Sequence, residues 1–79
     1  MKGITFDGMK ILADSGAIKN IKLIASASGM IVEINGDYIL QTQRKNARLF
    51  KNPSALFDLL FAIGIKQINN IDLTHWSSN

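Results

Sequence analysis

Asn35-Gly36, set between two runs of alternating apolar residues, decides more of this chain's architecture than any other dipeptide. Asn-Gly is the strongest short signal for a β-hairpin, because both residues accept the left-handed backbone of a tight turn. If Asn35, Gly36 and Asp37 form the loop, the apolar residues of both runs share one face. These residues are Met30, Val32, Ile34, Tyr38 and Leu40, with Ile34 opposite Tyr38. The sequence therefore predicts an antiparallel hairpin with one apolar face.

Another strand is predicted before this hairpin. Residues 21–25 alternate in the same way, and a turn at residues 27–29 separates them from Met30, so three antiparallel strands follow one another. We expect the third strand to run on past Leu40, through a bulge near residues 45–46, as far as Phe50.

Two helices flank these strands. Thr5 is a good cap for a short first helix that ends at Gly16. Asn52 is a cap for the second helix, Pro53 suits its first turn, and Gly64 ends it. The core face of the second helix has apolar residues at the i, i+3, i+4 and i+7 positions. They are Leu56, Leu59, Leu60 and Ile63.

The predicted fold is one small α+β domain over residues 1–79. Its element order is α-β-β-β-α-β, with an antiparallel sheet packed against one main helix. Ile65, Ile68, Ile71 and Leu73 predict a final strand, broken at Asn69-Asn70. Residues 75–79 form a polar tail that we expect to be frayed.

Length and composition bound what the chain can be. It has 79 residues, no cysteine and one histidine, so disulfides and cysteine- or histidine-rich metal sites are excluded. The core must form from the 47% of residues that are apolar, and a domain this small gains from further burial by self-association. The formal net charge of +3 permits binding to nucleic acid or acidic surfaces without requiring it.

The sequence does not indicate catalysis. Asp58 has no second acid, metal-ligand spacing or nucleophile–base set near it in the sequence, and no glycines have the spacing of a phosphate-binding loop. We expect neither an enzyme nor a cofactor or metal. The first residues lack the apolar segment of a secretion signal, and the most apolar run, residues 55–65, is far shorter than the ~20 residues of a membrane-spanning helix. We therefore expect a cytoplasmic protein with no membrane partner.

Between Asp37 and Asp58 the chain has no acidic residue, yet it places several cations close together. Such a stretch suits contact with nucleic acid, because fixed cations release counterions and the amides between them hydrogen-bond to phosphates or base edges. It suits equally an ordinary solvated edge strand whose charges prevent aggregation. The candidate nucleic-acid-binding residues are Gln43, Arg44, Lys45, Arg48 and Lys51.

Phe57 and Phe61 form a second apolar ridge on the second helix, apart from its core face. Two interpretations stand side by side. Either the hairpin and the first helix bury both rings, or the rings form the interface of a homodimer or of a complex with a protein partner.

A set of short motifs resembles a known family. It comprises Ser15-Gly16-Ala17-Ile18, Gly29 before an alternating strand, Leu40 with Gln43-Arg44, then Arg48, Phe50 and Gly64-Ile65. Over residues 4–72 the chain resembles the small ParC-family partition-associated proteins of plasmids and integrative conjugative elements.

The resemblance implies an accessory role in the maintenance of mobile DNA, without catalytic activity. Together with the basic strand, it leads to the hypothesis of a protein that binds DNA, or a partition or regulatory protein. The alternative is a protein-interaction or dimerisation module that uses the apolar helix face and binds no nucleic acid.

Overall fold

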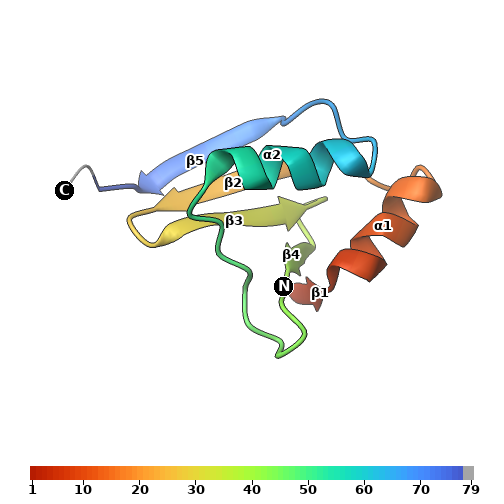
Figure 1. Ribbon diagram of the computed structural model, residues 1–79, viewed down its shortest axis with the longest axis horizontal. Helices are drawn as coiled ribbons and strands as arrows, with labels where there is room; N and C mark the ends of the chain where they lie inside the picture. Colours follow the sequence, from red (N-terminus) through yellow and green to blue (C-terminus); the bar gives the residue numbers. More distant parts are fainter. Residues whose placement is uncertain (78–79) are drawn as a thin grey trace.

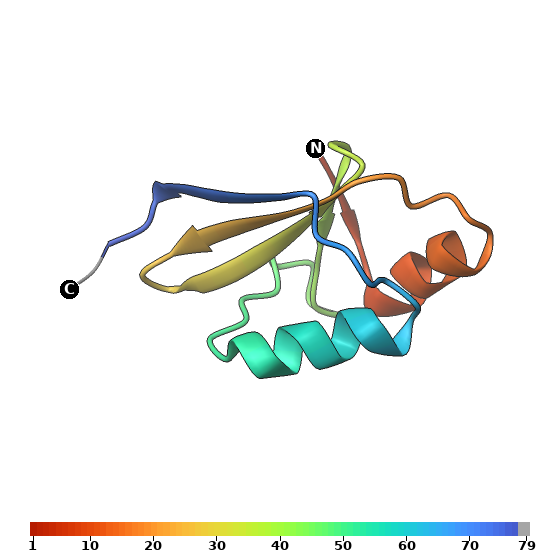
Figure 2. The ribbon, with the colours of Figure 1, turned by 90° about the horizontal axis from the view of Figure 1, so that it is seen from above.

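A single five-stranded sheet carries both helices on one of its faces in the computed structural model, which describes residues 1–77 (Figures 1 and 2). In chain order the elements are β1 (Lys2–Ile4), α1 (Phe6–Asp14), β2 (Ile21–Ser26), β3 (Gly29–Ile34), β4 (Tyr38–Leu40), α2 (Pro53–Ala62) and β5 (Asn70–His75). The predicted α+β class is confirmed. The predicted element order is roughly matched, with β1 as an addition before the first helix.

The central part of the sheet is the predicted antiparallel meander of β2, β3 and β4. Ile34 pairs with Tyr38, so the hairpin register is as predicted. Asn35 and Gly36 have φ values of 58° and 73°, which is the left-handed region that a tight turn needs.

The sheet as a whole is mixed, so the prediction of an antiparallel sheet is wrong at both edges. Its strand order is β1-β4-β3-β2-β5. At one edge β1 runs parallel to β4, and at the other β5 runs parallel to β2. The physical reason is that α1 and α2 are both crossover connections. A helix that crosses one face of a sheet returns the chain in its starting direction, so the strands on either side of the helix are parallel.

The core lies between the helices and the sheet. Thr5 Oγ1 accepts a hydrogen bond from the Gly8 N–H at 3.3 Å, and Asn52 Oδ1 accepts one from the Ser54 N–H at 2.9 Å, which confirms both predicted caps. The first helix contributes to the core as well as the second, so the sheet does not pack against one helix alone. The buried core residues are Met9, Ile21, Leu23, Val32, Ile34, Leu40, Phe50, Leu56 and Leu60.

The third strand is much shorter than predicted. β4 ends at Leu40, and the chain leaves the sheet as a loop that returns at Phe50, where an isolated antiparallel bridge joins Phe50 to Met30. A turn with a left-handed residue, Lys45 at φ 66°, replaces the expected bulge. The fraying predicted for residues 75–79 is wrong at its first residue, because β5 includes His75. Residues 78–79 of that predicted tail lie outside the described residues.

Candidate nucleic-acid interface

The first two of the four candidate cations, Arg44 and Lys45, lie on a tight loop formed by residues 41–47, here called the basic loop. Gln41 and Ala47 form an antiparallel bridge at its base. Within it the Thr42 N–H donates to the Asn46 carbonyl at 2.8 Å, and the Lys45 N–H donates to the Thr42 carbonyl at 3.0 Å. The basic loop is therefore a hydrogen-bonded turn and not a strand edge.

The base of the basic loop is fixed to the sheet through Gln41. Its N–H donates to the carbonyl of Ile4, at the end of β1, at 2.7 Å. A Cβ atom at Gly3 would collide with the Gln41 side chain, so this side chain lies directly over the backbone of β1. β1 is thus the support that holds the loop beside the sheet edge.

The tip of the basic loop carries three of the candidate residues. Gln43, Arg44 and Lys45 are consecutive and exposed, and the Arg44 N–H donates to Thr42 Oγ1 at 3.3 Å. The loop extends away from the helices and from β5, below the sheet in Figure 1. The structure therefore brings together an amide and two cations on a protruding turn.

The other two candidates follow the basic loop and have different surroundings. The Arg48 guanidinium carbon lies 4.9 Å from the centre of the Phe50 ring, within the range of a cation–π interaction, and Arg48 is half-buried. Lys51 is exposed and directly precedes Asn52, the cap of α2. The first turn of α2 contains no acidic residue, so the positive end of the helix adds to the potential near Lys51.

No carboxylate neutralises these cations within the part of the chain that the structure describes. The only ion pair among residues 1–77 joins Lys22 and Asp72, with 3.8 Å between Nζ and Oδ2. Hydrogen bonds from the Thr74 side chain and backbone lower the pKa of Asp72, and the positive charge of Lys22 lowers it further. This pair lies on β2 and β5, at the far side of the sheet from the basic loop.

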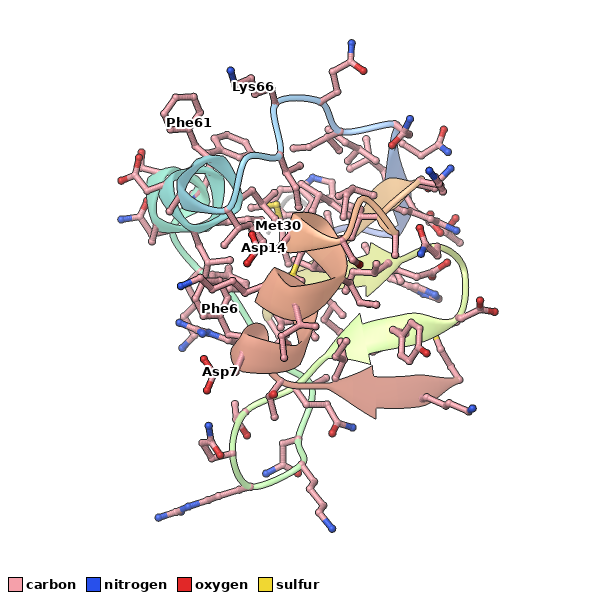
Figure 3. All side chains as sticks on the ribbon, turned by 90° about the vertical axis from the view of Figure 1, so that its right-hand side faces the viewer. Phe6, Asp7, Asp14, Met30, Phe61 and Lys66 are labelled. Atoms are coloured by element: carbon pink, nitrogen blue, oxygen red, sulfur yellow. The ribbon has the colours of Figure 1, made fainter. Side chains whose placement is uncertain are left out.

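Phe57 and Phe61, the candidate partner residues, are not buried. Phe57 is 47% exposed and Phe61 is 68% exposed, and Figure 3 shows Phe61 projecting from α2 close to Lys66. The interpretation that the hairpin and α1 cover both rings is therefore wrong. α1 lies beside the C-terminal end of α2 (Figure 2).

Sequence reasoning missed four further exposed apolar residues near α2. They are Leu49, Ile71, Leu73 and Trp76, between 47% and 60% exposed. Ile71 and Leu73 are predicted to lie in a final strand, but β5 begins only at Asn70, after the predicted break. The sequence did not show that this strand is at the edge of the sheet, where no helix covers its apolar face.

The described residues contain no cluster of metal-binding side chains. Among residues 1–77, no three histidine, aspartate or glutamate side chains come together in an arrangement that could hold a metal ion. Neither α1 nor α2 has the length and apolar character needed to cross a lipid bilayer. A scan against protein-family models finds no match to this chain, and searches of curated proteins and of solved structures find none.

Proposed function

We propose that this protein is a non-enzymatic accessory factor of mobile-element maintenance that binds DNA through the basic loop and the adjoining cations. The observation that carries the proposal is the set of four cations, Arg44, Lys45, Arg48 and Lys51, that have no carboxylate partner within residues 1–77. The resemblance to ParC-family proteins supplies the mobile-element context. A partition or regulatory protein with an acidic surface would be bound by the same charges.

The mechanism is electrostatic docking without covalent chemistry. The hydrogen-bonded turn holds Arg44 and Lys45 apart from the body of the protein, so both reach a phosphate backbone without displacing other contacts. Arg48 is held against Phe50, which reduces the side-chain entropy lost on binding. The Gln43 amide adds hydrogen bonds to phosphates or base edges.

The test compares two double charge reversals with equal net charge. Arg44→Glu/Lys45→Glu alters the tip of the basic loop, and Lys10→Glu/Lys19→Glu alters exposed lysines elsewhere. Each single substitution lowers the net charge by two, so the formal net charge of both double variants falls from +3 to −1. We expect the tip variant to lose DNA binding in a gel-shift titration and the control to keep most of it.

Salt dependence provides the second measurement. The slope of log K against log salt should be about −0.9 for each phosphate contacted in duplex DNA, and the tip variant should have a slope smaller by roughly two contacts. Failure of the wild-type protein to bind DNA at low salt would reject the proposal. So would equal losses in the tip variant and its control.

A second candidate function is favoured by the exposure of Phe57 and Phe61. Large apolar side chains at the surface mark sites for a protein partner when they form a continuous patch. This protein-interaction module would need no nucleic acid. Its complex would persist or strengthen as salt rises, whereas DNA binding would weaken.

A further inference from the structure

The exposed apolar residues around α2 line two neighbouring hollows, which together are called the apolar groove here. Phe57 and Phe61 line it along α2, and Ile71, Leu73 and Trp76 line it along β5. Leu49 and Pro53 close the end near the start of α2. Pro53 and Phe57 are about one helical turn apart, so the two halves of the groove adjoin.

The groove is open because β5 has no helix over it. Ile71 is in register with the buried Leu23 of β2, so it belongs to the face of the sheet that carries the helices. α2 covers β2 and β3 through Leu56 and Leu60, but Ile71 remains 59% exposed and Leu73 60% exposed. The helix-bearing layer therefore stops one strand short of the sheet edge.

A partner bound in the groove would pack on the face of β5 and would not extend the sheet as an additional strand beside β5. Asp72 Oδ1 accepts the Thr74 N–H at 2.8 Å, which occupies a backbone donor of the edge strand. The register also shifts between Ile24 and Ser26 where they pair with β5. A charged side chain and an irregular register are two devices by which edge strands resist pairing with another strand.

The exposed apolar area of the groove is close to the area that each partner buries in a stable interface. At about 200 Å² for each large side chain and exposures between 47% and 68%, its six exposed apolar residues present roughly 700 Å² of apolar surface. The largest patch on a typical monomer is about 300–600 Å². Each partner in a standard interface buries about 800 Å².

The apolar groove is complementary in shape to a second copy of itself. α2 supplies a ridge of two rings, and the neighbouring β5 supplies a flat apolar face. Asp58 and Lys66 line the same hollow as the two rings. A twofold dimer requires such self-complementarity, because each contact occurs twice.

We propose that the apolar groove is the interface of a homodimer in which Phe57 and Phe61 of each copy pack on Ile71, Leu73 and Trp76 of the other. This names the partner for the second candidate function and does not depend on DNA binding. The dimer covers the uncovered face of β5 with α2 of the second copy, which completes the helical layer on both sheets.

Sedimentation velocity over a range of protein concentrations tests this proposal. We expect a wild-type dimer that persists at high salt. Phe61→Glu and Leu73→Lys should each weaken self-association by about tenfold or more, because interface anchors carry most of the binding energy. Ile11→Glu is the matched control, because Ile11 is 67% exposed on α1, outside the groove, and this variant should remain dimeric.

Mixing the two variants tests the reciprocal geometry. In a mixed dimer of Phe61→Glu and Leu73→Lys chains, one contact keeps both native residues and the other places Glu against Lys. We expect the mixture to form a heterodimer although each variant alone is a monomer. Circular dichroism confirms that each variant is folded, and Phe61→Gln replaces Phe61→Glu if the latter is not.

Three results would overturn the homodimer: a wild-type monomer at every concentration, variants that associate as well as the wild type, or a mixture that stays monomeric. None of these variants changes the basic loop. The charge reversal at Arg44 and Lys45 therefore tests the DNA-binding proposal separately from the dimer.

Discussion

Asn35 holds the α1–β2 connection against the β3–β4 hairpin, and its replacement should destabilise the protein although it is a turn residue at the surface. Its side-chain Oδ1 accepts hydrogen bonds from the N–H groups of Lys19 and Asn20, at 2.7 and 3.0 Å. Its Nδ2 donates to the carbonyl of Ala17 at 2.9 Å. Three backbone groups far away in the sequence thus depend on one amide.

The magnitude follows from two separable contributions. Each hydrogen bond is worth about 0.5–1.5 kcal/mol, and partial exposure of these three favours the low end, so Asn35→Gly should cost about 2 kcal/mol. Asn35→Ala loses the same bonds and also forces alanine into the left-handed region at φ 58°, which adds about 1 kcal/mol. In a domain of this size, 1 kcal/mol corresponds to about 4–8 °C in Tm.

Thermal and urea unfolding followed by circular dichroism measure both variants, under conditions in which the oligomeric state is the same. Gly36→Ala is the matched control, because Gly36 has φ 73° and a Cβ there would meet no atom within 4 Å. It therefore measures the backbone cost of alanine in this turn without loss of a side-chain contact. The free energy of unfolding of Asn35→Gly could instead lie within about 0.5 kcal/mol of the wild-type value, which is less than one hydrogen bond contributes. The three bonds would then not stabilise the fold.

Two further predictions concern β3 and β5. Gly29→Ala should destabilise more than Gly36→Ala, because Gly29 has φ 138° and its added Cβ would lie 3.1 Å from the Phe50 carbonyl oxygen; equal losses of stability in urea would contradict this. The pKa of Asp72 lies below its ordinary value of 3.8, so its contribution to stability is present above that value and is lost as the pH falls toward the folded-state pKa. Thr74→Val removes the side-chain donor that contributes most to this shift, and the Asp72 pKa followed by NMR should then rise toward 3.8; an unchanged pKa would contradict this account.

The features predicted correctly from the sequence are those that a few neighbouring residues determine. The caps Thr5 and Asn52, the turn at Asn35-Gly36 and the apolar face of α2 can each be recognised from residues no more than about seven positions apart. The hairpin register follows from the same local rule, since a three-residue loop keeps the apolar residues of both strands on one face and a two-residue loop would mix the faces.

The features missed or wrong depend on which strands become neighbours. β1 has three residues and no alternation long enough to indicate a strand, and it forms because its edge pairs with β4. The basic stretch has the composition of a polar edge strand, but Thr42 and Lys45 close a turn that removes it from the sheet. The exposure of Ile71 and Leu73 follows from the position of β5 at the sheet edge, which no local pattern reveals.

The strand order gives the two proposed surfaces a definite relation. The basic loop is anchored to β1 at one edge of the sheet. The apolar groove follows β5, the strand at the other edge (Figure 1). A dimer formed through the groove therefore leaves both basic loops exposed at its two far ends. Two linked loops bind one DNA molecule more tightly than a single loop wherever the spacing allows both to engage, because the second contact is intramolecular. Self-association and DNA binding would then reinforce each other, and the two surfaces meet at Lys51, which lines the end of the groove.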